Sequence, residues 1–231
     1  MTVSAVVFDW GGTLTPWHTM ELADAWRACG LGEDSAARLL AAEDTLWARA
    51  RETQRSGTLD EVFAAAGVRA GPGELARYYA WWEEHTFTDP DVRPLFEGLR
   101  ERGIKVGVLS NTLWPRTEHE RVFRRDGVAD LIDAAVYTSE IEWTKPHPLA
   151  FRTALDAVGG VRPEDAVFVG DRPWDDIAGA KGVGMRAVLL PHSAIPAHQQ
   201  GPVQGVPDAV VGRLSELLPL VDSWRGGSSG S

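Results

Sequence analysis

The sequence predicts an α/β fold, in which helices cover a parallel sheet and a helical segment interrupts the sheet after its first strand. Short apolar runs recur along the chain, and helical patterns separate the later runs. The runs are continuously apolar, which is typical of strands that are covered on both faces. Residues 16–90 contain no convincing strand pattern, so the inserted segment is expected to be entirely helical.

The first strand is expected at "VSAVVF", residues 3–8, and it ends at a lone carboxylate, Asp9. Further runs have the same character: "IKVGVL" (104–109), "DAAVYT" (133–138), "DAVFVG" (165–170) and "MRAVLL" (185–190). Helical patterns lie between these runs, the last of them "DDIAGAKGVG", and the closing stretch "DAVVGRLSELLPLV" predicts a short strand and a final helix. Strands that alternate with helices form βαβ units and a parallel sheet.

The helical segment divides the chain into two parts. The expected division is a core of residues 1–15 and 91–225, a cap of residues 16–90 and a flexible tail of residues 226–231. The cap begins just past Asp9, where open parallel sheets bind their ligands. We therefore expect it to act as a lid over the site.

Glycines and hydroxyl side chains mark the expected helix ends within the cap. Gly30, Gly57 and Gly67 stand where helices should stop, because glycine adopts the left-handed conformation of a helix end. Ser35 and Thr58 stand where a side-chain oxygen can cap the next helix.

Composition excludes several classes of partner. The 231 residues include 23 Lys and Arg against 33 Asp and Glu, a net charge of −10, and no run of basic residues. Nucleic acid is therefore not an expected partner. No apolar run approaches membrane-spanning length, so a membrane is not expected either. The single cysteine, Cys29, fits a packed thiol in a reducing cytoplasm. A monomer or a homodimer is expected.

Polar side chains follow four successive predicted strands. Asp9 follows the first strand, Ser110 the second, and Lys145 lies beyond the third. A carboxylate cluster follows the fourth strand and consists of Asp171, Asp175 and Asp176. Because parallel strands end at one edge of a sheet, these side chains are expected to converge there.

Phosphoryl transfer is the chemistry that this set favours. Converging carboxylates repel one another, and a hard cation with oxygen ligands, Mg²⁺ above all, relieves the repulsion. Lys145 offers a compact positive charge to phosphate oxygens and Ser110 a hydrogen bond. Asp9 is then the expected covalent nucleophile. Contacts to the substrate are expected from Gly12, Thr13 and Asn111, which adjoin Asp9 and Ser110.

The motifs resemble those of the haloacid dehalogenase-like superfamily, the phosphohydrolases with an aspartate nucleophile. The matching stretches are "FDWGGTL", "VLSNT", "TKPHP" and "VGDRPWDDIAGAKGVGM", which together span about residues 3–190. The resemblance implies a Rossmann-like core, a C1-type helical cap and an aspartyl-phosphate on Asp9. It also implies that Asp9, the carbonyl of Gly11 and Asp171 bind Mg²⁺. Either Asp176 or Asp175 would hold the ion through water, and spacing alone does not decide between the two.

Gly11 departs from the family's pattern, because its phosphatases usually carry an acid/base aspartate at this position. A phosphatase acting on a small phosphorylated metabolite remains the first interpretation, with the proton supplied by solvent or by a cap residue such as His18 or Glu21. The second is a 2-haloacid dehalogenase-type hydrolase, which uses Asp9 against carbon. The third is a binding protein without turnover.

Tryptophans are the last feature, and the chain has 10 of them. Those that border the motifs in sequence are Trp10, Trp17, Trp114, Trp143 and Trp174. We expect Trp10, Trp114 and Trp174 to form an aromatic wall that binds an apolar, sugar or ring-bearing leaving group. Trp26 and Trp47, in the cap, are instead expected to fill a helical core.

Overall fold

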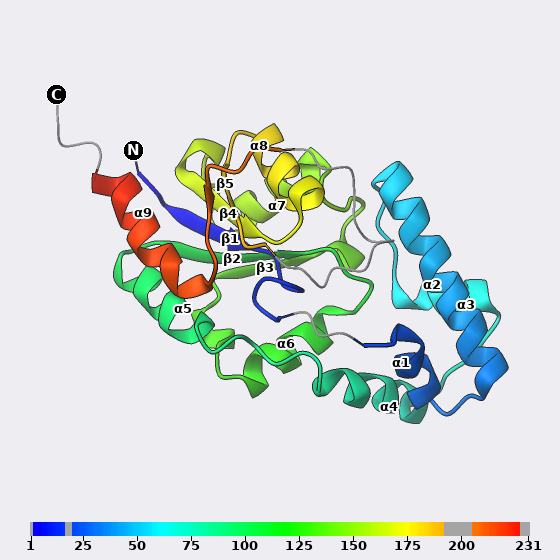
Figure 1. Cartoon of the computed structure of the whole chain (residues 1–231). Coiled ribbons are helices and arrows are strands. Elements are labelled where there is room, and N and C mark those ends of the chain that lie inside the picture. Colours follow the sequence, from blue (N-terminus) through cyan, green and yellow to red (C-terminus); the bar gives the residue numbers. More distant parts are fainter. Residues whose placement is uncertain (1, 17–19, 192–204, 227–231) are drawn as a thin grey trace.

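The computed structural model describes residues 2–16, 20–191 and 205–226. It has the predicted α/β fold, with a parallel sheet in the order β3-β2-β1-β4-β5-β6 (Figure 1). The strands are β1 (Ala5–Phe8), β2 (Lys105–Ser110), β3 (Ala134–Tyr137), β4 (Ala166–Gly170), β5 (Arg186–Leu189) and β6 (Ala209–Val210). The closing strand and helix predicted after residue 207 are thus present.

Alternate side chains of each strand pack into different layers, which explains the continuously apolar runs. Val6 and Phe8 of β1 belong to one hydrophobic cluster and Val7 to the other. The first layer contains α5 (Val92–Glu101), α6 (Arg116–Arg125) and α9 (Leu217–Gly226), and the second contains α7 (Pro148–Ala157) and α8 (Gly179–Gly182) (Figure 1).

The strand order places a topological switch beside β1. The chain runs from β1 to β2 and β3 on one side, then returns to β4, which pairs with β1 on its other side. In this register Phe8 is opposite Val169. Asp9 and Asp171 therefore leave the same edge of the sheet, at the position where open α/β sheets bind ligands.

The inserted segment forms helices, here called the cap helices: α1 (Leu22–Ala28), α2 (Glu33–Thr53), α3 (Leu59–Ala66) and α4 (Pro72–Glu83). They lie together at one end of the molecule, beyond the sheet (Figure 1). Cys29 follows α1 and is fully buried, as expected of a packed thiol.

Two of the expected helix signals in the cap were wrong. Helix α2 ends at Thr53, where Gln54 adopts the left-handed conformation with φ +57°, so Gly57 does not stop it. A Cβ on Gly57 would lie 2.7 Å from the Leu46 side chain, so close packing favours glycine there. Ser35 lies inside α2, because the helix already begins at Glu33.

The other predicted helix ends and the other predicted helix cap agree with the structure. Gly67 ends α3 with φ +62°, and Gly30 has φ +75° just after α1. The Thr58 hydroxyl caps α3 by accepting a hydrogen bond from the Glu61 N–H at 3.3 Å.

A short contact joins the end of α2 to the core. The Ser56 N–H donates to the Glu142 carbonyl at 3.0 Å, and the Thr144 N–H donates to the Gln54 carbonyl at 2.9 Å. Arg55 forms an ion pair with Glu142 at 2.6 Å. The core segment held in this way ends next to Lys145, so the cap is tied to the strand-end region of the core.

None of the helices in the described ranges has the length and apolarity needed to cross a bilayer.

Candidate active site

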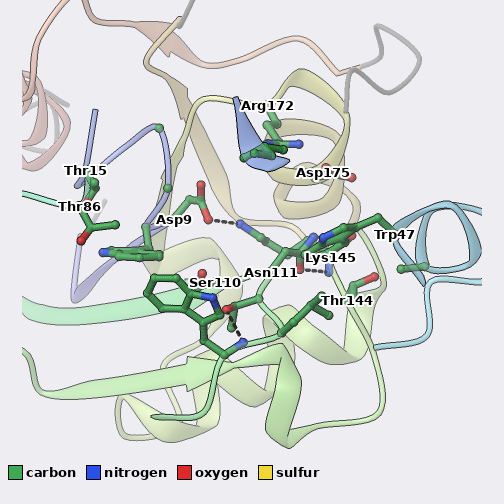
Figure 2. Close-up of a pocket in the computed structure, with 18 of the residues that line it drawn as sticks. Asp9, Thr15, Trp47, Thr86, Ser110, Asn111, Thr144, Lys145, Arg172 and Asp175 are labelled. Carbon is green, nitrogen blue, oxygen red and sulfur yellow. Dashed lines mark hydrogen bonds and ion pairs between the residues drawn. The ribbon is translucent and has the colours of Figure 1, made fainter. Parts of the chain in front are cut away.

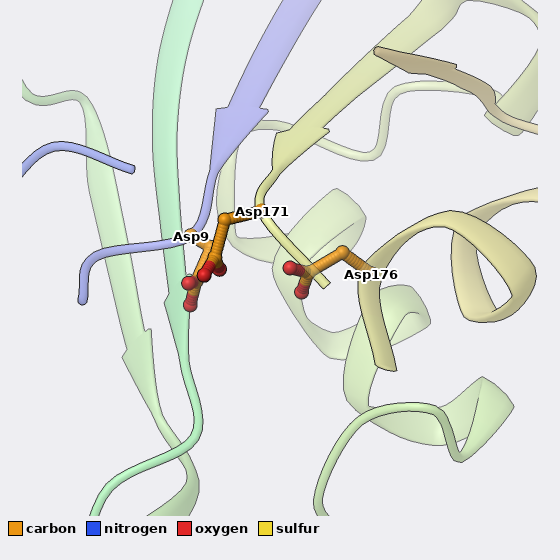
Figure 3. A group of neighbouring side chains, drawn as sticks. All are labelled: Asp9, Asp171 and Asp176. Carbon is orange, nitrogen blue, oxygen red and sulfur yellow. The ribbon is translucent and has the colours of Figure 1, made fainter. Parts of the chain in front are cut away.

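The centre of the site is a buried group of carboxylates, Asp9, Asp171 and Asp176 (Figure 3). Asp9 follows β1 and Asp171 follows β4, so the two flank the topological switch. Asp176 lies five residues beyond Asp171. One oxygen from each carboxylate lies within 4.8 Å of those of the other two. The structure thus brings together residues that are more than 160 positions apart in sequence, as the strand-end argument predicts.

Lys145 joins two of these carboxylates. Its Nζ lies 2.6 Å from Asp9 Oδ1 and 2.7 Å from Asp176 Oδ1, and its side chain is almost fully buried. Asn111 fixes the backbone of Lys145, because its Oδ1 accepts from the Lys145 N–H at 2.8 Å and its Nδ2 donates to the Lys145 carbonyl at 3.1 Å (Figure 2). The sequence predicts Asn111 as a substrate contact, and the structure gives it this positioning contact in addition.

Asp176 is held by an unusual helical turn. Residues Pro173–Ala178, labelled η4, form a π-helical turn where the sequence pattern predicts an ordinary helix. The N–H groups of Asp176 and Ile177 both donate to the Arg172 carbonyl, at 3.0 and 3.2 Å, which widens the turn. Asp176 Oδ2 in turn accepts from the Arg172 N–H at 2.9 Å. Asp176, rather than Asp175, therefore faces Asp9 and Lys145.

Burial and neighbouring charges raise the pKa of two carboxyls in this group, Asp171 and Asp176. Burial raises the pKa of Asp171 well above its usual range, and the charges of Asp9 and Asp176 raise it further. Burial also raises the pKa of Asp176 to about 6, although Lys145 opposes the shift. Burial lowers the pKa of Lys145, but Asp176 and Asp9 more than offset this, and the net shift is upward. Lys145 therefore stays charged.

The donor set of this group fits a hard divalent cation. Both carboxylate oxygens of Asp171 are buried and accept no hydrogen bond from any described residue. Leaving two buried acceptor oxygens without hydrogen-bond partners is costly. Carboxylate oxygens that converge from several elements are the ligands that Mg²⁺ prefers. The Asp171 oxygens are thus available as ligands for a cation.

The loop after Asp9 is tightly folded. Gly12 has φ +90°, a conformation that favours glycine, and its N–H donates to the Thr15 carbonyl at 2.7 Å. The N–H groups of Leu14 and Thr15 both donate to the Trp10 carbonyl, at 2.9 and 3.0 Å. Gly11, at the start of this turn, has no side chain that could transfer a proton.

A cavity of about 190 Å³ opens over Asp9, between the core and the cap helices. The core contributes polar groups to its lining, among them Ser110, Asn111, Lys145, Arg172 and Asp175 (Figure 2). The cap helices contribute Glu43, Trp47, Arg51, Tyr78 and Trp82. The cap therefore covers the site, which is the arrangement that the expected lid requires.

The tryptophans are placed partly as expected. Trp10, Trp114 and Trp174 line the cavity. Trp26 is buried in the helical core as expected, and Trp47 packs against the same core while its partly buried side chain also lines the cavity. The signal that sequence reasoning missed is the helical spacing of Glu43, Trp47 and Arg51, which places them on one face of α2.

Several other residues that the sequence places at or near the motifs are not found in the cavity lining. Trp143 is not among the residues that line the cavity, and it stacks on His147 with ring centres 4.0 Å apart. Glu21 is exposed, and its neighbours Met20 and Leu22 line the cavity instead. Thr13 is buried and is not in the lining, while Gly12 is. His18 and Trp17 lie outside the described residues.

Substitution of Gly170, which packs closely against Asp176, tests the position of the Asp176 side chain. A Cβ on Gly170 would lie 2.3 Å from Asp176 Oδ2 and 2.5 Å from its Cβ. We expect Gly170→Ala to displace Asp176 from Lys145 and to destabilise the protein by about 1–3 kcal/mol, as overpacking does. Urea unfolding measures this loss. Gly182→Ala is the matched control, because a Cβ there would meet nothing within 4 Å, and an equal loss in both variants would contradict the assigned contact.

Comparison with known proteins agrees with this geometry. The family model for haloacid dehalogenase-like hydrolases matches residues 3–184. Phosphatase MT3486 of Mycobacterium tuberculosis is 30% identical over 241 residues, which cover 96% of this chain and 98% of that protein. The glyceraldehyde 3-phosphate phosphatase of Methanopyrus kandleri is 36% identical over 132 residues, or 57% of this chain, and the match spans only 55% of that relative's length.

A solved structure shows the same fold. The L-2-haloacid dehalogenase from Xanthobacter autotrophicus superposes with a TM-score of 0.66 and 22% identity, over 98% of this chain and 99% of that chain. At this level of identity the likeness concerns the fold alone. Both the parallel core and the helical insertion are thus present in a protein of known structure.

Proposed function

We propose that this chain, which belongs to the haloacid dehalogenase-like hydrolases, is a Mg²⁺-dependent phosphatase that hydrolyses a small phosphomonoester through an aspartyl-phosphate on Asp9. The observation that carries the proposal is the buried carboxylate group in which the Asp171 oxygens have no hydrogen-bond partner among the described residues. Such a group calls for a hard cation, and a cation beside a nucleophile suits an anionic phosphate ester.

Asp9 is the nucleophile in this proposal. A carboxylate oxygen of Asp9 attacks phosphorus, the new oxygen–phosphorus bond forms, and the bond to the leaving alcohol breaks. The leaving oxygen takes a proton from water, since Gly11 offers none. Water then attacks the phosphorus of the aspartyl-phosphate, which releases inorganic phosphate and restores Asp9. The first step consumes the Asp9 carboxylate and the second step regenerates it.

Lys145 and Ser110 position Asp9 and bind the phosphate group in this proposal. Lys145 holds Asp9 in place through its 2.6 Å contact and stays charged, so it can also neutralise a phosphate oxygen. Ser110 ends β2 beside the cavity and can donate a hydrogen bond to the same group. Asn111 acts through Lys145, whose backbone it fixes.

A magnesium ion would be held by Asp9, the Gly11 carbonyl and Asp171, with Asp176 reaching it through water. When bound, the ion neutralises the carboxylates and the phosphate oxygens.

The relatives named as phosphatases support a small phosphorylated metabolite as the substrate. The enclosed cavity under the cap also suits a small molecule.

A second candidate is 2-haloacid dehalogenation, in which Asp9 attacks carbon. Gly11 favours it, because that reaction does not need the acid that phosphatases usually carry there. The clustered carboxylates count against it, because they add repulsion near Asp9 that a metal-free reaction has no reason to retain.

Phosphate release from para-nitrophenyl phosphate tests the proposal. This ester has a good leaving group, so its cleavage does not depend on an acid at Gly11. We expect turnover with Mg²⁺ and its loss in EDTA. Turnover that is unchanged in EDTA would contradict the metal site. Halide release from 2-haloacids, without phosphate release, would favour the second candidate.

A further inference from the structure

We infer that the alcohol part of the substrate carries an ammonium group, and that Glu43 and the aromatic rings around it bind that group. The inference rests on the proposed function, because it concerns the leaving alcohol of the same phosphomonoester. Its evidence is independent of the carboxylate group at Asp9, since it comes from the cap side of the cavity.

Glu43 is a cavity-lining carboxylate to which the described part of the chain gives no cationic partner. Its Oε2 accepts a hydrogen bond from Trp26 Nε1 at 2.8 Å. No lysine, arginine or histidine among the described residues forms an ion pair with it. Burial raises the pKa of Glu43, its indole neighbours Trp26 and Trp47 offset part of this shift, and Asp44 adds to it. A carboxylate kept in such surroundings lacks a compensating positive charge, which a bound cation would supply.

Aromatic rings enclose the same part of the cavity. Trp47, Tyr78, Trp82 and Trp114 all line it. The ring centres of Trp82 and Trp114 lie 5.6 Å apart, and those of Tyr78 and Trp82 lie 6.4 Å apart. Trp26, which donates to Glu43, stacks on Tyr78 at 4.6 Å. Several aromatic faces together with a carboxylate form the kind of site that binds ammonium groups through cation–π attraction.

The charges of the cavity are separated along α2. Glu43, Trp47 and Arg51 lie on one face of this helix, and Arg51 is about 12 Å further along than Glu43. Arg51 acts electrostatically on Asp175, as do Arg172 and Lys145, so these cations gather near the carboxylate end of the cavity. A molecule with phosphate at one end and an ammonium group at the other matches this polarity.

The remaining titratable residue in the lining is His85, and it does not neutralise Glu43. His85 packs against Trp81 with ring centres 4.3 Å apart and ring planes tilted by 49°, and it is not among the groups that shift the pKa of Glu43. A neutral sugar would gain from the aromatic faces but would leave the carboxylate uncompensated. An ammonium group uses both features, so it is the ligand chemistry that the described residues favour.

Calorimetry with choline tests the inference without any catalytic step. Its neutral carbon isostere, 3,3-dimethylbutan-1-ol, has the same shape and lacks the charge. We expect choline to bind about tenfold more tightly than the isostere, the ratio that cation–π attraction and a carboxylate can supply. In Glu43→Gln this ratio should fall towards one. In Asp44→Asn, a change of equal charge at an exposed neighbour on the same helix, most of the ratio should remain.

Equal binding of choline and the isostere to the wild-type protein would overturn the inference, whether or not the variants fold. A ratio that survives in folded Glu43→Gln would overturn the role of Glu43. Turnover of para-nitrophenyl phosphate by the same preparation tells apart the two possible failures. Turnover without selective choline binding refutes only the ammonium site, and selective choline binding without turnover refutes only the proposed phosphatase.

Steady-state kinetics with a charged and a neutral phosphate ester of the same shape then measure whether the enzyme prefers the ammonium-bearing substrate. We expect kcat/KM for choline phosphate to exceed that for 3,3-dimethylbutyl phosphate by about tenfold, and Glu43→Gln to reduce this preference. A higher kcat/KM for the neutral ester would contradict the inference.

Discussion

Asp9→Asn is expected to lower kcat for phosphate release by roughly 10³–10⁶-fold, which is the range found when a covalent nucleophile is removed. The amide is a poor nucleophile and carries no charge. It also loses the charged contact with Lys145 Nζ, now 2.6 Å from Asp9 Oδ1. The measurement is steady-state phosphate release with Mg²⁺ from para-nitrophenyl phosphate.

Asp130→Asn serves as the control for this variant. Asp130 is exposed and lies outside the cavity, so the same chemical change there is expected to leave kcat within about twofold of the wild type. If Asp9→Asn kept a tenth or more of the wild-type kcat, Asp9 would not be the nucleophile.

Asp171→Asn is expected to have opposite effects on stability and activity. In the metal-free protein Asp171 is buried beside Asp9 and Asp176, and burial and these charges raise its pKa. A carboxyl whose pKa is raised on folding destabilises the folded state above the pKa of the unfolded chain, so at neutral pH Asp171 costs stability. The amide removes this cost. In EDTA, Tm should therefore rise by roughly 2–4 °C, the shift that about 1 kcal/mol produces in a chain of this size.

When Mg²⁺ is added, the wild-type protein should have the higher Tm instead of the Asp171→Asn variant. The wild-type protein should be stabilised, because a ligand that binds only the folded state raises Tm, and the variant should respond little. Phosphatase activity should be lost together with this response. A variant with lower Tm than the wild type in EDTA would show that Asp171 has a structural role instead, and an unchanged response to Mg²⁺ would exclude Asp171 as a ligand.

The sequence was sufficient to predict the sheet and the convergence of the strand-end residues. The strands are continuously apolar because both faces are covered, and parallel strands necessarily bring their ends to one edge. Asp9, Lys145 and Asp171 could therefore be placed together without knowledge of any contact. The helical insertion was equally plain, because no strand pattern interrupts it.

The features that were missed depend on packing between distant segments. The end of α2 at Gln54 coincides with the contact between residues 54–56 and the core, and Gly57 instead meets Leu46. The choice between Asp175 and Asp176 depends on the π-helical turn, whose shared Arg172 carbonyl no local pattern reveals.

The cavity face of α2 was also missed, although its spacing was visible. Trp47 fits a helical core as well as a cavity wall, because both require an apolar face on the same helix. What distinguishes the two is Glu43, which lies four residues earlier on that face. A carboxylate in line with a partly buried tryptophan is the signal that a cavity, rather than packed core, covers this part of the helix.

The missing side chain at Gly11 is expected to affect the rate of one step of the reaction. The residue has no side chain to activate water, so hydrolysis of an aspartyl-phosphate should be slow relative to its formation from an ester with a good leaving group. The covalent intermediate should therefore accumulate during turnover.

The most direct test is to quench the enzyme with acid during turnover of para-nitrophenyl phosphate and to locate the phosphoryl group by peptide mass spectrometry. The proposed mechanism predicts a phosphoryl group on Asp9, formed only with Mg²⁺ and absent from Asp9→Asn. Release of phosphate with no phosphoryl group on the protein, or with one on a different residue, would contradict nucleophilic attack by Asp9.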